Sequence, residues 1–129
     1  MYRVAVTEHF DAAHRIVGHQ GGCANLHGHR ITVVPEFSGT HLDELGILVD
    51  FKVVKSELRK LIALVDHTYL NENEVISFNP TAENLAKWFY QRLKETLEPT
   101  FRCLYKSSVE LSSVKIFESP DCWAEYSEG

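Results

Sequence analysis

Three histidines and a cysteine lie within sixteen residues near the start of the chain: His14, Cys23, His27 and His29. The whole sequence has only seven histidines and three cysteines, so this crowding is a signal of a metal site. Three neutral imidazoles that leave a fourth position open are typical of catalytic zinc, whereas structural zinc is usually enclosed by cysteines. We therefore predict that His14, His27 and His29 bind Zn²⁺ in a catalytic site.

Two alternatives stay open on the spacing alone. Cys23 could be a fourth ligand, in which case the metal would only stabilise the fold. The histidines could also line a loop without binding metal. The type of ligand and the short His-x-His spacing favour the catalytic site over both.

The residues around the histidines indicate two strands. Residues 30–37 are β-branched and alternating, so His27 and His29, two apart, would point to one face. Residues 2–14 also alternate, with His14 on their more apolar face. Because consecutive strands usually pair, His14 is expected to meet the other two imidazoles.

Two helices are expected in the middle of the chain. Asp50 is a plausible N-cap for the first, whose apolar residues recur at three and four through about Val65. The second would begin with Asn79 as its cap and Pro80 in its first turn, and would end at Pro99.

The end of the chain reads as two further strands. Residues 109–118 are strand-like with a change of parity near Ser112, which suggests a bulge, and Glu118 continues the apolar face. Residues 122–126 alternate as a closing strand. Cys103 and Cys122 have no neighbouring ligand or base, and we expect both to be small core residues.

The order of two strands, two helices and two strands predicts an α+β fold. A four-stranded antiparallel sheet would carry both helices on one side, in a single domain spanning residues 1–129. Oligomerisation would bury more surface in a chain of this size.

Composition bears on partners and location. The net charge is -5, and we expect no basic helix face, which argues against nucleic acid as the main partner. No apolar run reaches membrane-spanning length, and the chain starts directly with a strand, so neither a membrane segment nor a signal peptide is expected. Three cysteines without Cys-x-x-Cys spacing suggest free thiols and a cytoplasmic location.

Asp66 and His67 follow the first predicted helix. A carboxylate beside an imidazole can orient the ring and raise its basicity, which suits proton transfer. The dipeptide alone is better explained by a histidine that interacts with the helix dipole.

Six stretches, in this order, resemble the family of 6-pyruvoyl-tetrahydropterin and 6-carboxytetrahydropterin synthases over nearly the whole chain. Each is weak alone, but their order is specific. They are residues 10–15 (FDAAHR), 23–29 (CANLHGH), 49–51 (VDF), 65–71 (VDHTYLN), 79–84 (NPTAEN) and 118–126 (ESPDCWAEY).

The resemblance implies the tunnelling fold, in which subunits join their sheets into a barrel, as a trimer or a dimer of trimers. It also implies zinc on His14, His27 and His29. Cys23 resembles the family's proton-abstracting thiol, and Asp66 with His67 its acid/base pair, often supplied across a subunit interface.

The resemblance implies a pterin pocket as well. Glu118 resembles the carboxylate that accepts N–H groups of the pterin ring, and Thr81, Ala82 and Glu83 match the turn that lines the same pocket.

The implied substrate is 7,8-dihydroneopterin triphosphate. The compact chain and its ending resemble the branch that forms 6-carboxy-5,6,7,8-tetrahydropterin, with loss of acetaldehyde and triphosphate, for queuosine synthesis. The pyruvoyl-forming branch is one alternative. A zinc-containing protein that binds a pterin or purine without catalysis is another.

Overall fold

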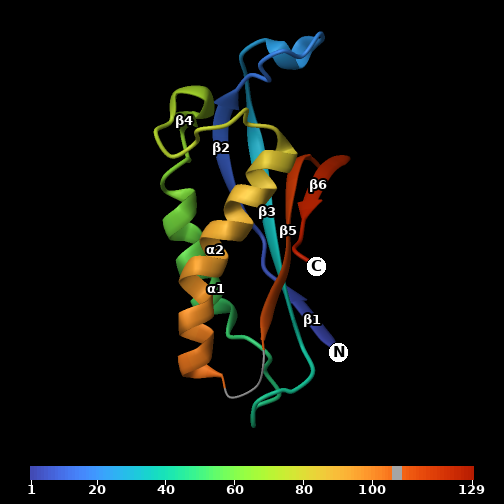
Figure 1. Cartoon of the computed structure of the whole chain (residues 1–129), viewed down its shortest axis with the longest axis vertical. Coiled ribbons are helices and arrows are strands. Elements are labelled where there is room, and N and C mark those ends of the chain that lie inside the picture. Colours follow the sequence, from blue (N-terminus) through green and yellow to red (C-terminus); the bar gives the residue numbers. More distant parts are fainter. Residues whose placement is uncertain (106–108) are drawn as a thin grey trace.

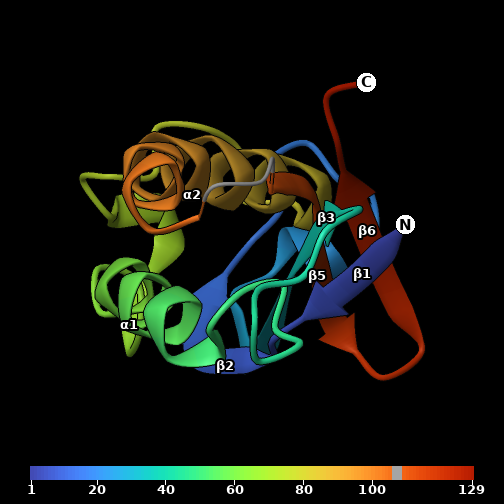
Figure 2. The ribbon, with the colours of Figure 1, turned by 90° about the horizontal axis from the view of Figure 1, so that it is seen from below.

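The computed structural model describes residues 1–105 and 109–129. Two helices, α1 (Phe51–Ile62) and α2 (Ala82–Leu104), pack on one side of a sheet, as Figure 2 shows from below. The strands are β1 (Tyr2–Ala5), β2 (Glu8–His14), β3 (His27–Gly39), β4 (Thr68–Tyr69), β5 (Glu110–Ser119) and β6 (Cys122–Tyr126). Figure 1 shows the long β3 and β5 in the middle of the sheet.

The sheet differs from the predicted four-stranded antiparallel one, because it has six strands and is mixed. Its order is β4-β2-β3-β5-β6, with β1 also pairing with β3. The four predicted strands form the antiparallel part, and β4 adds a two-residue parallel edge next to β2. So short a strand has no periodicity to reveal it in the sequence.

The first predicted strand is interrupted between β1 and β2. The register of both with β3 is the same, from Tyr2 opposite Gly39 to His14 opposite His27. This register puts Val6 opposite Pro35, whose nitrogen has no hydrogen to donate to the ladder. The proline therefore accounts for the break.

The core lies between the sheet and the helices, and it includes Phe10, Ile31 and Phe89, all at most 1% exposed. Asp50 caps α1 as predicted, by accepting a hydrogen bond from the Lys52 amide at 2.9 Å. The helix ends at Ile62, three residues before the predicted end, and continues as turns.

The outer face of α1 is more basic than predicted. Four of its exposed or half-exposed residues are cations that line one broad groove: Lys52, Lys55, Arg59 and Lys60. Glu8 pairs with Arg59 at 2.9 Å and Glu57 with Lys60 at 2.9 Å, so the charge of this face is partly balanced.

Both predicted ends of the second helix were wrong. The N-cap is Thr81, whose hydroxyl accepts the Asn84 amide at 3.1 Å, and not Asn79. The helix also continues through Pro99 to Leu104. Pro99 and Glu95 are exposed, so water can satisfy the carbonyl that the proline leaves without a donor.

The bulge near Ser112 is confirmed, since Ser113 pairs with Glu36 and Leu111 with the next residue, Phe37. The expectation that Cys103 and Cys122 are core residues was wrong, because both are exposed. Cys103 lies on the outer side of the last turns of α2, and Cys122 begins β6 after the turn. In the part of the chain that the structure describes, neither helix is long and apolar enough to cross a membrane.

Candidate active site

The three predicted ligands come together at one end of the sheet. His14 ends β2 opposite His27, and His29 lies two residues further along β3. The ring centroids are 4.6 Å apart for His14 and His27, 4.7 Å for His14 and His29, and 5.1 Å for His27 and His29. One ring nitrogen of each lies within 4.8 Å of the other two, close enough to share an ion.

Backbone carbonyls fix two of these rings. Nδ1 of His14 donates to the Pro80 carbonyl at 2.8 Å, and Nδ1 of His27 donates to the Asn25 carbonyl at 2.9 Å. A carbonyl can only accept, so the proton of each neutral ring lies on Nδ1 and the Nε2 lone pair is free. This is the usual outer arrangement of a metal-binding histidine.

The structure leaves two buried nitrogens of the triad without partners. Nε2 of His14 and Nε2 of His29 are buried and have no hydrogen bond. Burying a polar nitrogen unpaired costs free energy, and buried polar groups almost always have a partner. A divalent cation would satisfy both lone pairs, so the residues present fit a metal ion.

The protonation state of the buried histidines favours binding of a cation. Burial lowers the pKa of His14 and of His29, which favours the neutral imidazoles that bind metal. The negative charge of the Glu118 carboxylate opposes this effect, because it raises the pKa of both rings. Glu118 of β5 therefore lies close enough to the triad for its negative charge to interact with both buried imidazoles.

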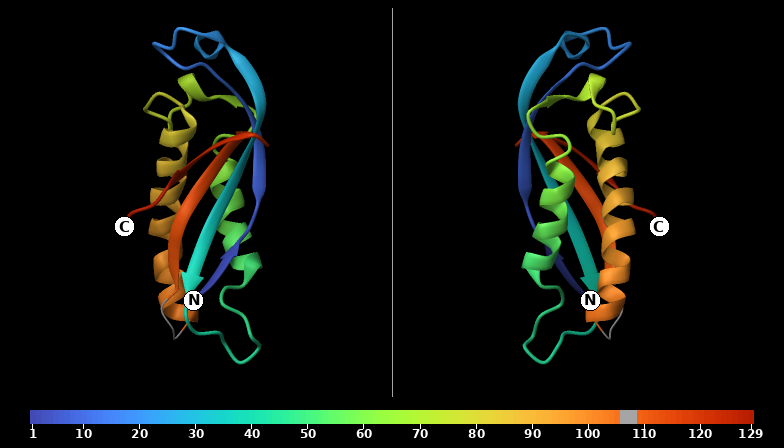
Figure 3. Two further views of the ribbon diagram at one scale, coloured as in Figure 1. Left: turned by 90° about the vertical axis from the view of Figure 1, so that its right-hand side faces the viewer. Right: turned by 90° about the vertical axis from the view of Figure 1, so that its left-hand side faces the viewer.

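Cys23 lies outside the metal cluster. It belongs to a 3₁₀ turn, Gly22–Ala24, in a loop that projects beyond the ends of β2 and β3 (Figures 1 and 3). The thiol is exposed, and within the described residues it is not grouped with the three imidazoles. This favours an open metal site over one that Cys23 closes.

Asp66 and His67 form a hydrogen-bonded pair. Nδ1 of His67 lies 3.0 Å from Oδ1 of Asp66, and the same oxygen accepts the Asp11 amide at 3.0 Å. The amide of Asp11, and then His67, lower the pKa of Asp66, so the carboxylate is ionised at neutral pH. It can therefore orient the imidazole.

The backbone at His67 is constrained. Its φ is 58°, which is uncommon for a residue with a side chain, and its amide donates to the Asp11 carbonyl at 2.6 Å. Backbone constraint of this kind tends to gather at functional sites. A left-handed backbone is also common where a helical segment ends, and here it sets the His67 side chain beside Asp66.

His67 and His29 both line a cavity of about 440 Å³. Asp11 and Arg30 line it too, and Arg30 Nε contacts Asp11 Oδ1 at 3.1 Å. The sequence reasoning missed these two residues. Pairing the two predicted strands in register would have found them, because Asp11 lies directly opposite Arg30.

The predicted pterin-binding turn lies beside the triad. Thr81 is the N-cap of α2, Ala82 is buried and Glu83 is exposed in the first turn. The Pro80 carbonyl, which accepts from His14, connects this turn directly to the metal ligands. The structure therefore brings a helix N-terminus, with its free amides, close to the triad.

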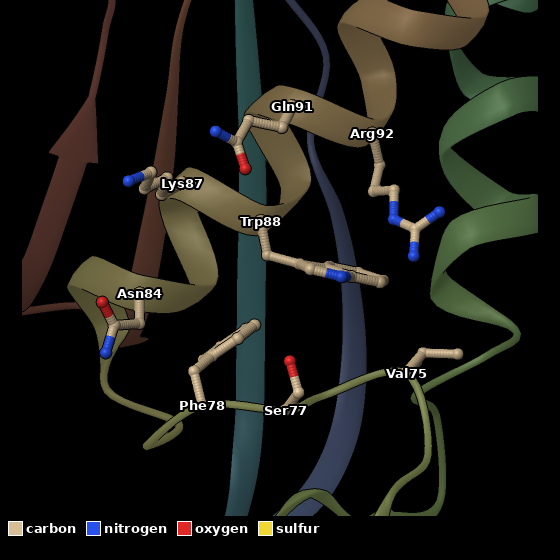
Figure 4. A pocket seen from close by; sticks show the side chains of 8 residues that line it. All are labelled: Val75, Ser77, Phe78, Asn84, Lys87, Trp88, Gln91 and Arg92. Atoms are coloured by element: carbon tan, nitrogen blue, oxygen red, sulfur yellow. The ribbon is translucent and has the colours of Figure 1, made fainter.

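A second pocket, of about 410 Å³, lies elsewhere. Figure 4 shows the Trp88 indole and the Phe78 ring facing each other between the first turns of α2 and the preceding segment. Lys87 and Arg92 border the pocket, and the Arg92 guanidinium lies 5.7 Å from the indole centroid. None of the predicted site residues lines it.

The chain is similar to known pterin synthases. A family model described as 6-pyruvoyl tetrahydropterin synthase matches residues 3–129. The 6-carboxy-5,6,7,8-tetrahydropterin synthase of Rickettsia bellii is 31% identical, over 90% of this chain and 93% of its own. The enzyme of that name from Synechocystis is 34% identical, over 91% and 86%.

The fold also has a solved counterpart. The structure of Caenorhabditis elegans 6-pyruvoyl tetrahydropterin synthase superposes with a TM-score of 0.82, covering 99% of this chain and 96% of that one. Sequence identity is 24%, so this likeness concerns the fold.

Proposed function

The chain belongs to the 6-pyruvoyl tetrahydropterin synthase family, and we propose that it is a zinc-dependent 6-carboxy-5,6,7,8-tetrahydropterin synthase. It would convert 7,8-dihydroneopterin triphosphate with loss of acetaldehyde and triphosphate. The observation that carries the proposal is the set of three imidazoles from paired strands, with the Nε2 atoms of His14 and His29 buried and unpaired.

In this proposal His14, His27 and His29 hold the zinc ion. Zinc, when bound, supplies a Lewis acid that polarises the substrate hydroxyls it contacts. The neutral state of the buried rings and the carbonyls that fix two of them support this assignment.

The proton-transfer groups are Cys23 and the Asp66–His67 pair. Cys23, as a thiolate, takes a proton from the substrate side chain, and His67 returns or relays one at its ring nitrogen. Asp66 accepts from Nδ1 of His67, which leaves Nε2 to face the substrate.

The pterin ring would bind between Glu118 and the first turn of α2. The Glu118 carboxylate accepts two N–H groups of the ring, and the backbone at Thr81, Ala82 and Glu83 lines the other side. The electrostatic influence of Glu118 on both buried imidazoles supports a position that spans pterin and metal.

We also propose that the active protein is a trimer or a dimer of trimers, with the sheets joined into a barrel. In the described chain Cys23 is grouped neither with the triad nor with Asp66 and His67, and a neighbouring subunit would complete the set. The three free thiols support a reducing, cytoplasmic setting.

Incubation with 7,8-dihydroneopterin triphosphate and mass spectrometry of the products test the proposal. The expected products are 6-carboxy-5,6,7,8-tetrahydropterin, acetaldehyde and triphosphate. Formation of 6-pyruvoyl-tetrahydropterin with triphosphate alone would assign the protein to the other branch. Binding of the pterin without release of triphosphate would make it a non-catalytic pterin protein.

A further inference from the structure

The loop that carries Cys23 has no hydrophobic anchor. None of residues 15–26 is buried, and the segment includes Gly18, Gly21 and Gly22. A segment without a buried side chain depends mainly on its hydrogen bonds, and such segments open easily. The polar contacts of the loop must therefore fix the position of the thiol.

Two asparagine side chains form hydrogen bonds with the first residues of this loop. Asn71 accepts the Arg15 amide through Oδ1 at 2.9 Å and donates from Nδ2 to the Arg15 carbonyl at 2.9 Å. Asn79 does the same to Val17, at 2.9 Å and 3.1 Å. Each carboxamide thus pairs with one residue of the loop as the backbone of a neighbouring strand would.

The residue between these two contacts leads to Cys23. In an extended chain, the backbone groups of successive residues point to opposite sides. Arg15 and Val17 face the asparagines, and the Ile16 amide donates to the Cys23 carbonyl at 2.6 Å. A short chain of hydrogen bonds therefore connects the two asparagines to the backbone of Cys23.

The asparagines themselves are well held. The Asn79 carbonyl accepts from Thr81 N at 2.8 Å and from Asn84 Nδ2 at 3.0 Å, in the first turn of α2. Asn71 belongs to the 3₁₀ turn Leu70–Glu72, whose first residue is fully buried. The loop is thus tied to the core through both side chains.

We propose that Asn71 and Asn79 are positioning residues that fix the Cys23 loop relative to the rest of the site. Asn71 follows His67 by four residues, and Asn79 precedes the Thr81 turn by two. The pair therefore ties the loop that carries the thiol to the segments of the same chain that follow His67 and precede the pterin-binding turn. The catalytic part of this inference rests on the proposed function, whereas the loop positioning does not.

The test compares the variant Asn71→Ala/Asn79→Ala with Asn73→Ala. Asn73 is a suitable control because its Nδ2 donates to the Leu64 carbonyl and to Thr68, and not to the loop. Hydrogen exchange of peptides from residues 15–26 and alkylation of Cys23 by iodoacetamide, followed by mass spectrometry of its peptide, are measured without substrate.

The double variant is expected to exchange and to be alkylated at least about tenfold faster at this loop, while Asn73→Ala matches the wild type there. Its zinc content should be unchanged and its kcat should fall, with a smaller change in KM. The single variant Asn79→Asp, which keeps the acceptor and loses the donor, should show an intermediate effect and serves if the double variant does not fold.

Loop exchange and alkylation equal to the wild type in these variants would overturn the inference. A normal kcat despite a loosened loop would overturn its catalytic part. If the wild type forms no pterin product, the proposed function fails, but the exchange and alkylation results still decide whether the asparagines position the loop.

Discussion

The metal-binding and the proton-transfer regions of the site are built in different ways. The triad lies on the ends of two paired strands, and its geometry follows from one register that puts His14 opposite His27. Cys23 lies on an exposed loop, and His67 is exposed at the sheet edge. A metal site requires three atoms fixed relative to one another, which strands provide, whereas proton donors must reach the substrate.

Replacing the thiol separates the two regions most sharply. Cys23→Ala should reduce product formation by about 10²-fold to 10⁴-fold, the size usual for loss of a general base. Zinc content and thermal stability should match the wild type, because Cys23 is neither a ligand in the described cluster nor buried. Steady-state kinetics with elemental analysis measure both. A Cys23→Ala protein that loses its zinc would show that Cys23 belongs to the metal-binding region.

Removing the negative charge of Asp66 tests the second half of the proton-transfer region. Asp66→Asn should lower kcat by about 10-fold to 100-fold, as expected when the group that orients a functional imidazole is lost. The loss should appear mainly in kcat and less in KM, because the ring loses the acceptor that fixes its orientation. Asp121→Asn, at an exposed turn, is the control. An unchanged kcat for Asp66→Asn would speak against an acid/base role for the pair.

The pH dependence of stability tests the metal-binding region without metal. Burial lowers the folded-state pKa of His14 and His29 below the value of about 6.5 in an unfolded chain. The unfolded chain then takes up protons that the folded one does not as the pH falls below that value. The free energy of unfolding of the metal-free protein should fall, by at most about 2.7 kcal/mol per pH unit for two histidines.

Urea unfolding of the metal-free protein between pH 7.5 and 5.5 measures this slope. His29→Gln, which removes one of the two buried imidazoles, should make it shallower. Stability that rises as the pH falls through this window would show that the two rings are not held neutral by burial.

The smallest effect is expected at the turn between the two regions. Thr81→Ala removes the hydroxyl that accepts the Asn84 amide and should lower the free energy of unfolding by about 1 kcal/mol. Thr100→Ala, which removes a hydroxyl bonded within the same helix, should cost less. Equal losses in urea unfolding would mean that Thr81 does not act as the cap.

The difference between paired strands and an exposed loop also explains which parts of the site could be predicted from the sequence. The triad was predictable because strand periodicity puts His27 and His29 on one face and consecutive strands usually pair. The relation of Cys23 to the rest of the site was not, because the loop has no periodicity and its position depends on Asn71 and Asn79, more than fifty residues away.

The errors in the fold have local causes of the same kind. Asn79 reads as a helix cap, but its side chain binds Val17, and Thr81 takes the capping role. Pro99 reads as a helix end, but on an exposed face water can replace the lost hydrogen bond. In each case a contact or an exposure that local sequence does not encode decides the outcome.

Zinc binding to metal-free protein tests the central claim most directly. After reloading and gel filtration, elemental analysis should find about one zinc ion per chain in the wild type. The variant His29→Gln, with its fold checked by circular dichroism, should retain none. A wild type that keeps no zinc, or a folded His29→Gln that keeps as much as the wild type, would contradict the account.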